Sequence, residues 1–240
     1  MKILITGSSG KLGKEVLKIC PESLHPAHAE LELVDKSLVS NYIAKYEPET
    51  VIHLAAWTDV RGCEENKSKA WESNVTATEN LVEACQQDDK KCYFVYMSTA
   101  CVFRGDKGDY TETDLPYPDN FYSLTKLIGE FITKQMKEHL IIRANFVQRE
   151  KWKYGRAFTD RFGTYLFADD LAKAIKEVVA RRLIGIVHIA GKEKLSMFEL
   201  AKITTPDIKP MTLRDVDLSL PRDMSLRSIR IEPYGLSRKA

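Results

Sequence analysis

The sequence lacks apolar runs long enough to cross a membrane, and it has almost no excess charge of either sign. Its 240 residues carry 36 Lys and Arg against 34 Asp and Glu, which gives a formal net charge of +2. Such a balance does not favour a nucleic-acid or membrane partner. The sequence also shows no basic and apolar leader before its first apolar run. We therefore expect a protein of the cytoplasm.

Cysteine is also scarce, and its placement excludes the usual metal patterns. The cysteines number five, at positions Cys20, Cys63, Cys85, Cys92 and Cys101. Their number is odd, and no pair has the spacing typical of metal ligands. We expect reduced thiols and no metal site.

Short apolar runs alternate with helical patterns along most of the chain. This alternation predicts an α/β fold, in which helices cover a parallel sheet. Strands are expected at 3–6, 51–56, 93–97, 140–143 and 186–190, with weaker ones at 24–28 and 31–34. Helices are expected at 12–20, 37–46, 67–87, 121–138 and 169–182, and a capping box at Ser196 to Glu199 predicts one more short helix.

Glycines follow the first predicted strand at a regular spacing. Gly7, Gly10 and Gly13 lie between that strand and the helix that follows it. Gly7 suits a tight turn, Gly10 leaves room for a phosphate, and Gly13 lets the helix pack close to the sheet. The helix N-terminus then offers free N–H groups to a pyrophosphate. The pattern favours a dinucleotide site, and the alternative is a tight turn without a nucleotide.

The choice between NAD and NADP stays open. An acidic residue usually follows the second strand and binds the adenosine ribose. Here that strand is weak and ends near His25, Pro26 and His28, without a well-placed Asp, Glu or Arg. His28 is either a surface residue or a contact for a 2′-phosphate.

A hydroxyl, a phenol and an amine follow later in the chain. Thr99 ends a predicted central strand, and Tyr122 and Lys126 share one face of a predicted helix. A cation near a phenol favours its ionised form, so Tyr122 suits proton transfer to or from a carbonyl or alcohol. The alternative is a surface pair. Together with the glycine turn, these residues indicate hydride chemistry with a nicotinamide cofactor.

The chain resembles the extended short-chain dehydrogenase/reductase superfamily, and within it the dTDP-4-dehydrorhamnose reductase group. The matching segments are 7–13, 30–35, 48–58, 74–81, 97–103, 122–130, 168–172 and 187–191. The resemblance implies a Rossmann-like, doubly wound sheet of about seven parallel strands from residues 1–145 and 167–192. A small, discontinuous substrate-binding region would come from residues 146–166 and 193–240.

The resemblance also implies roles for individual residues. Thr99, Tyr122 and Lys126 take the catalytic positions, and Thr99 would also contact the substrate. Asn74 either supports the lysine through water or is only a polar residue of a helix face. Contacts to NADP(H) or NAD(H) are expected from Tyr122 and Lys126 and from Gly7, Ser9, Gly10, Lys11, Leu12, Asp35, Leu54, Ala55, Ala56, Asn74 and Asn145.

The chain departs from the family in two places. Ala100 and Cys101 stand where the reductases usually have an acidic and an aromatic residue. The stretch 146–168, which in the family builds part of the sugar-nucleotide pocket, is short. Its Arg149, Trp152 and Arg156 are nevertheless expected to bind the substrate, through phosphate contacts and base stacking. The alternative is a solvated loop.

The expected activity is NAD(P)H-dependent reduction of a 4-keto sugar nucleotide. The alternatives are an NAD-dependent sugar-nucleotide epimerase and a cofactor-binding regulatory subunit without catalysis. A homodimer is possible through the helices at 67–87 and 121–138. Val75, Leu81, Leu127 and Phe131 would then lie in the contact, or only in the core of one chain.

Overall fold

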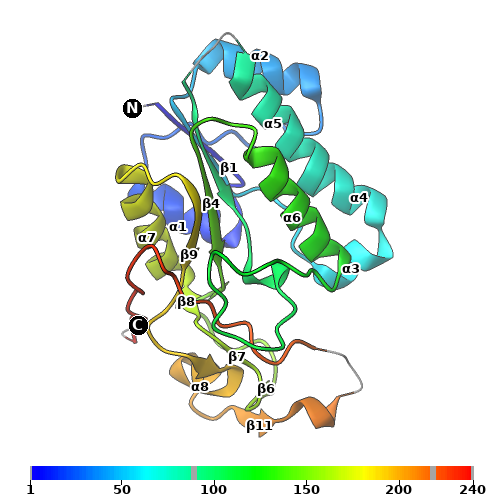
Figure 1. Ribbon diagram of the computed structural model, residues 1–240, viewed down its shortest axis with the longest axis vertical. Coiled ribbons are helices and arrows are strands. Elements are labelled where there is room, and N and C mark those ends of the chain that lie inside the picture. Colours follow the sequence, from blue (N-terminus) through cyan, green and yellow to red (C-terminus); the bar gives the residue numbers. More distant parts are fainter. Residues whose placement is uncertain (1, 88–90, 217–219, 239–240) are drawn as a thin grey trace.

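The computed structural model describes residues 2–87, 91–216 and 220–238. At its centre is a sheet of five parallel strands in the order β1-β2-β3-β4-β9 (Figure 1). These strands are β1 (Ile3–Thr6), β2 (Thr50–His53), β3 (Tyr93–Met97), β4 (His139–Ala144) and β9 (Gly185–Ile189). The α/β fold with a parallel sheet is confirmed.

The sheet is narrower than expected because the strands predicted at 24–28 and 31–34 do not form. Leu24 alone exchanges backbone hydrogen bonds with β1, at 2.7 Å to the carbonyl of Ile3 and 2.8 Å from the N–H of Ile5. Pro26 lacks the N–H that would continue this ladder. The residues that follow fold into turns, and they lie where a second strand would otherwise run.

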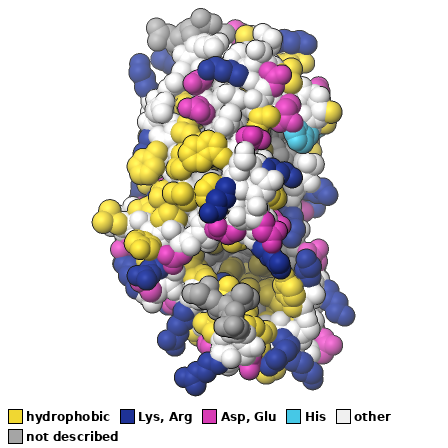
Figure 2. Space-filling model, turned by 90° about the vertical axis from the view of Figure 1, so that its right-hand side faces the viewer, with side chains coloured by type: hydrophobic (Ala, Val, Ile, Leu, Met, Phe, Trp, Pro, Cys, Tyr) yellow, Lys and Arg dark blue, Asp and Glu magenta, His cyan; other side chains and the backbone are white. Residues whose placement is uncertain are grey.

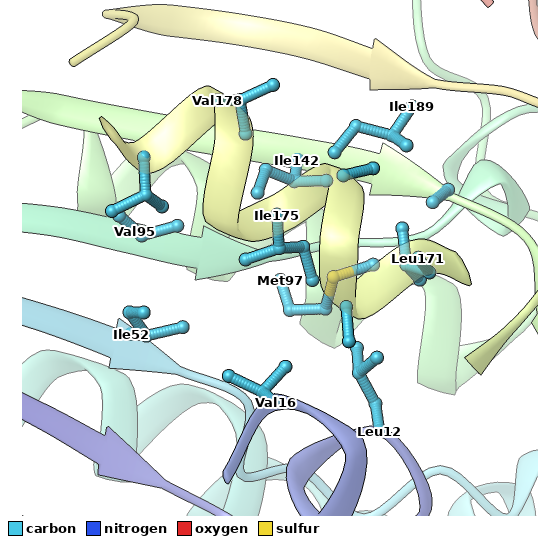
Figure 3. Close-up of a cluster of buried hydrophobic side chains, with 14 of the residues drawn as sticks. Leu12, Val16, Ile52, Val95, Met97, Ile142, Leu171, Ile175, Val178 and Ile189 are labelled. Carbon is cyan, nitrogen blue, oxygen red and sulfur yellow. The ribbon is translucent and has the colours of Figure 1, made fainter. Parts of the chain in front are cut away.

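Helices cover both faces of the sheet because side chains alternate along each strand. On one face, Ile5, Ile52, Val95 and Ile142 pack with α1 (Lys11–Ile19) and α7 (Ala168–Ala180) (Figure 3). On the other face, Leu4, Val51, Phe94 and Ile141 pack with α2 (Lys36–Tyr46), α5 (Ala77–Gln86) and α6 (Phe121–Thr133). This double covering is the doubly wound arrangement.

The helix predicted at 67–87 is interrupted. It consists of α4 (Lys67–Trp71), a π-helical turn η1 (Glu72–Thr76) and α5, and a short helix α3 (Val60–Glu65) precedes it. Asn74 lies inside the π-helical turn and is buried. π-helical turns often occur at functional sites because they redirect side chains and backbone groups.

A smaller lobe lies beyond the carboxyl ends of the strands (Figure 1). It contains β6 (Arg156–Phe158), β7 (Phe162–Gly163), β10 (Leu195–Ser196), α8 (Met197–Thr204), β11 (Lys209–Met211) and the 3₁₀ turn η4 (Leu213–Asp215). The predicted capping box is present at the start of α8. The short pair β5 (Phe146–Val147) and β8 (Leu166–Phe167) leads from β4 to this lobe and back to α7.

Residues 225–238 leave the small lobe and return along the main sheet (Figure 1). Tyr234 bridges to Gly191, and the Arg230 guanidinium donates to the carbonyl of Ile186 at 2.6 Å. The N–H of Ser237 donates to Asp170 on α7 at 2.9 Å. The structure thus places this segment against β9 and α7, although the sequence assigned it to the substrate-binding region.

Candidate active site

The glycine turn has the geometry that its sequence predicts. Gly7 has a φ of 72°, and a Cβ there would lie 2.6 Å from the backbone nitrogen of Ala55. A Cβ on Gly13 would lie 2.1 Å from the carbonyl oxygen of Gly7. Gly10 precedes α1 and makes no side-chain cap, so the helix N-terminus keeps free donors. Only glycines permit this close approach of turn, helix and β2.

A cleft of about 420 Å³ opens above this turn. It is bounded by the ends of β1 and β2, the turns after Leu24 and the helices α4 and α5. Its lining includes six of the predicted cofactor residues, namely Gly7, Ser9, Gly10, Leu54, Ala55 and Ala56. The glycine cradle, free helix N–H groups and apolar walls fit a dinucleotide.

Tyr122 and Lys126 lie one turn apart on α6, as expected. The Asn120 side chain caps this helix by accepting the N–H of Ser123 at 2.9 Å. Tyr122 packs with Trp57, Cys63, Ala70 and Cys101, and Trp57 also lines the cleft. Tyr122 thus packs in one cluster with a residue of the cleft wall, whereas Thr99, Tyr122 and Lys126 are not themselves among the residues that line the cleft.

Thr99 meets the phenol from the end of β3. Its hydroxyl accepts the N–H of Cys101 at 3.1 Å, which starts the 3₁₀ turn η3 (Ala100–Val102). Burial, and then Cys101, raise the pKa of Tyr122 well above its ordinary value, while a hydrogen bond with Thr99 works against this. The phenol is therefore protonated at neutral pH and can donate a proton.

Lys126 is deeply buried beneath the site. Its ammonium lies 4.1 Å from the centre of the Tyr96 ring. Burial lowers the pKa of Lys126 from 10.5 to about 7, and the Glu130 carboxylate opposes this shift. The amine thus titrates near neutral pH, where its charge can change the acidity of a neighbouring phenol.

The Asn74 side chain joins two parts of the site. Its Oδ1 accepts the N–H of Trp57 at 2.7 Å, and its Nδ2 donates to the Trp57 carbonyl at 3.1 Å. The same Nδ2 donates to Thr125 on α6 at 3.0 Å. Asn74 is therefore more than a polar residue of a helix face, because it fixes the loop after β2 against the helix that carries Tyr122.

A buried ion pair anchors the same helix to the sheet. Glu130 on α6 accepts from Nε and Nη2 of Arg143 on β4, at 2.8 Å and 2.6 Å. Ser98, at the end of β3, donates to the same carboxylate at 2.6 Å. These contacts hold α6, β3 and β4 together. They also explain how the charged side chain of Arg143 can be buried, since this residue is only 2% exposed.

His53 is a neutral buried residue at the end of β2. Burial, and then the charge of Lys126, lower the pKa of His53 to about 3. The Thr78 hydroxyl donates to the carbonyl of Asn74, so it accepts from Nε2 of His53 at 3.0 Å. Nδ1 is then an acceptor for the Thr6 hydroxyl at 2.7 Å. His53 thereby links β1, β2 and α5 under the cleft.

Several of the expected cofactor residues do not line the cleft. The Asp35 carboxylate caps α2 by accepting the N–H of Leu38 at 2.9 Å, and it does not line the cleft. Leu12 lies on the buried side of α1 and packs in the core. Lys11 is exposed at the start of α1, and Asn145 donates to the Met224 carbonyl at 2.8 Å. Their cofactor contacts stay predictions.

The expected substrate residues do not form one group. Arg149 forms ion pairs with Asp169 and Asp170 on α7, at 3.1 Å and 3.2 Å. Trp152 packs in a separate apolar cluster of the small lobe. Arg156 is exposed and donates to the Pro210 carbonyl at 3.2 Å. Because its guanidinium is already paired with two carboxylates, Arg149 is poorly placed to bind a phosphate.

Sequence reasoning missed Glu32 and Lys69, which line the cleft together with His28, the histidine already named as a candidate 2′-phosphate contact. The turns that bring in His28 and Glu32 have no regular pattern. Burial raises the pKa of the Cys101 thiol, and a hydrogen bond with Thr99 and then the charge of Arg161 oppose this rise. Burial also raises the pKa of Tyr165, and the charge of Arg161 opposes that rise. Arg161 and Tyr165 belong to the short stretch 146–168, so their approach to Cys101 depends on the fold of the small lobe.

The other sequence expectations have mixed outcomes. Val75 and Leu81 are buried in the core and Leu127 packs against a core cluster, whereas Phe131 is 59% exposed. Figure 2 shows hydrophobic side chains exposed among charged ones on the side of the molecule that carries α5 and α6. The homodimer stays a prediction.

Within the described residues, no helix is long and apolar enough to span a membrane, and no cluster of His, Cys, Asp and Glu suits a metal ion.

Comparison with known proteins supports the resemblance. The model of a family described as "RmlD substrate binding domain" matches residues 1–217. A probable low-salt glycan biosynthesis reductase of Haloferax volcanii is 34% identical, over 82% of this chain and 76% of that protein. The dTDP-4-dehydrorhamnose reductase of Aggregatibacter actinomycetemcomitans is 26% identical, with coverages of 83% and 76%. Methionine adenosyltransferase 2 subunit beta of Rattus norvegicus is 24% identical, with coverages of 99% and 84%.

Solved structures agree with the fold. A hypothetical dTDP-4-dehydrorhamnose reductase from Sulfolobus tokodaii has a TM-score of 0.83 and 33% identity, over 94% of this chain and 92% of that one. The reductase of that name from Bacillus anthracis, in complex with NADP, has a TM-score of 0.85 and 24% identity, over 95% and 91%. The Rossmann-like fold expected from the sequence is confirmed.

Proposed function

Because the chain belongs to the RmlD substrate binding domain family, we propose that it reduces a 4-keto sugar nucleotide with NADH or NADPH. The relatives named as reductases support this reaction class. The proposed substrate is a dTDP-linked 4-keto-6-deoxy sugar, or a sugar nucleotide close to it.

One observation carries the proposal. Thr99, which follows β3, shares a side-chain hydrogen bond with Tyr122, and Lys126 lies one turn further along α6. Trp57 belongs to the apolar cluster of Tyr122 and lines the cleft that fits a dinucleotide. Asn74, Glu130 and Arg143 hold this arrangement through buried hydrogen bonds. A protein that only bound a cofactor would not need a protonated phenol and a buried amine at that point.

The chain's own residues account for the proton in the reaction. NADH or NADPH, when bound, would supply the hydride that the keto carbon accepts. Tyr122 donates its phenolic proton to the keto oxygen, and the product is an alcohol. Thr99 orients that oxygen through its hydroxyl. Lys126, when protonated, stabilises the phenolate that Tyr122 becomes, and this lowers the barrier to proton transfer.

The protonation states favour the reductive direction. Burial keeps Tyr122 protonated before the reaction, which a general acid requires. The pKa of Lys126 lies at about 7, so a proton can pass between this amine and its surroundings near neutral pH. The phenol can thus regain its proton after each turnover.

A turnover assay with a dTDP-4-keto-6-deoxy sugar and reduced cofactor tests the proposal. We expect Tyr122→Phe to lose at least about a hundredfold in kcat while its cofactor affinity stays unchanged. Tyr117→Phe is the matched control, because Tyr117 is 58% exposed and lies outside the site.

Two results would contradict the proposal. Turnover without added reductant would indicate the epimerase alternative. If Tyr122→Phe kept the cellular function of the wild type and neither protein reduced the sugar, the chain would instead be a regulatory subunit.

A further inference from the structure

We propose that Glu32 makes the adenosine end of the cleft selective for NADH over NADPH. This inference deepens the proposed function and rests on it. It starts from the irregular segment 25–34, which replaces the second strand and lines the cleft with Pro26, Ala27, His28, Leu31, Glu32, Leu33 and Val34.

The position of this segment indicates which part of the cofactor it meets. Leu24 pairs with β1 on the side away from β2. The residues after it therefore leave the sheet where a second strand would end. In doubly wound folds an acidic residue at that point binds the ribose hydroxyls of adenosine. The pyrophosphate would lie at the neighbouring start of α1.

The Glu32 carboxylate makes two contacts within this segment. Its Oε2 lies 3.0 Å from Nδ1 of His28, and its Oε1 accepts the N–H of Val34 at 3.4 Å. The side chain keeps 41% of its surface exposed, so lone pairs remain for a ligand. A carboxylate accepts hydrogen bonds from ribose hydroxyls, but it repels a 2′-phosphate.

Compensating positive charge is scarce around Glu32. Within the described residues, the basic side chains of the cleft are His28 and Lys69, and no arginine lines it. Lys69 lies over the Trp57 ring, 4.7 Å from its centre, beyond the end of β2. Lys36, the first residue of α2, is paired with Glu83 on α5 at 2.5 Å and does not line the cleft. A 2′-phosphate would therefore lie beside the Glu32 carboxylate, and the imidazole of His28 would be the main group there that could offset its charge.

Direct binding titrations with NADH and NADPH test the inference. Trp57 lines the cleft, so quenching of tryptophan fluorescence reports occupancy. We expect the wild-type protein to bind NADH at least about tenfold more tightly than NADPH. Glu32→Gln removes the charge and keeps the shape, and it should bring the two Kd values within about threefold of each other. Glu32→Arg should reverse the preference.

Glu30→Gln is the matched control. Glu30 also stabilises the turn, because its carboxylate accepts the N–H of Ala27 at 3.4 Å, but it does not line the cleft. Its loss should leave the ratio of the two Kd values unchanged.

The outcomes separate this inference from the proposed function. A wild-type preference for NADPH, equal affinities, or the same change of ratio in Glu32→Gln and Glu30→Gln would overturn the inference alone. If neither cofactor bound the wild-type protein, both the inference and the proposed function would be contradicted.

Discussion

The ammonium of Lys126 lies 4.1 Å from the centre of the Tyr96 ring, inside the protein, while the carboxylate of Glu130 is paired with Arg143. The ring face attracts the cation, but it replaces only part of the water that burial removes. This explains why the pKa of Lys126 falls to about 7 although Glu130 lies one helical turn away.

Replacing Lys126 with Met should abolish turnover and stabilise the fold at neutral pH. The unfolded chain keeps an ordinary lysine pKa near 10.5, so between about pH 7 and 10.5 it binds a proton that the folded protein does not. Folding of the wild type is therefore penalised below pH 10.5, and fully so below about pH 7. We expect Lys126→Met to gain about 2–4 kcal/mol at pH 7. Urea unfolding at pH 7 and pH 10 measures this, and an equal gain at both values would contradict the explanation.

Removing one partner of the Glu130–Arg143 pair should be far more harmful than removing both. Glu130→Gln leaves the guanidinium of Arg143 buried without a counter-ion, and we expect a loss of about 3–5 kcal/mol. In the double variant Glu130→Leu with Arg143→Met, no charge remains, and the loss should be smaller than for either single change. Denaturant unfolding of all variants decides this, because strictly additive losses would show that the two residues do not act as a pair.

Replacing Asn74 should reduce kcat as well as stability. Asn74→Ala loses one buried and two partly buried hydrogen bonds, at a cost of about 2–4 kcal/mol. Asn74→Asp keeps the oxygen that accepts from Trp57 but loses the two hydrogen bonds that Nδ2 donates. Its kcat should therefore fall nearly as far as that of Asn74→Ala. Gln86→Ala is the control, since its Nε2 donates to the Gln135 carbonyl at 2.9 Å and neither residue lines the cleft, and it should leave kcat unchanged. Equal kcat values in all three variants would remove the positioning role of Asn74.

The acid sensitivity of the protein should depend on His53. The pKa of His53 is about 3 in the folded protein and 6.5 for the free side chain. Below pH 6.5 the unfolded state binds a proton that the folded state rejects, so stability falls as the pH falls from 6.5 towards 3. His53→Asn should be less stable at pH 7 and should lose less on acidification. Thermal unfolding from pH 7 to pH 4 compares the two slopes, and parallel slopes would exclude His53 as a cause.

A methyl group on Gly13 should disturb the turn, whereas one on Gly155 should not. The new Cβ would lie 2.1 Å from the Gly7 carbonyl oxygen in the first case, and it would meet nothing within 4 Å in the second. We expect Gly13→Ala to lose at least about 2 kcal/mol and to bind the cofactor weakly. Gly155→Ala should match the wild type within about 0.5 kcal/mol. If Gly13→Ala bound the cofactor normally, the close packing of α1 on the turn would not be required.

Local sequence was sufficient to predict the parts of the fold that depend on near neighbours. The strand, glycine turn and helix from Ile3 to Ile19 form as expected, and so does the spacing of Tyr122 and Lys126 on α6. The strands predicted at 24–28 and 31–34 failed, because Pro26 ends the ladder after a single bridge at Leu24.

Residues whose partners are distant in sequence were harder to predict. Arg149 was expected to bind a phosphate, but Asp169 and Asp170 reach it from α7. Asp35 was expected to contact the cofactor, yet it caps the helix that starts beside it. Glu32 was overlooked, because its place in the cleft follows from irregular turns that no sequence period indicates.

The segment 225–238 also has a consequence for solubility. β9 is the last strand of the main sheet, and an uncovered edge strand can pair with another molecule and start aggregation. Tyr234 and Arg230 occupy backbone groups along or just beyond this strand. Removing the residues from 225 onward would therefore expose the edge of β9 and favour aggregation through it, even if the cleft kept its structure.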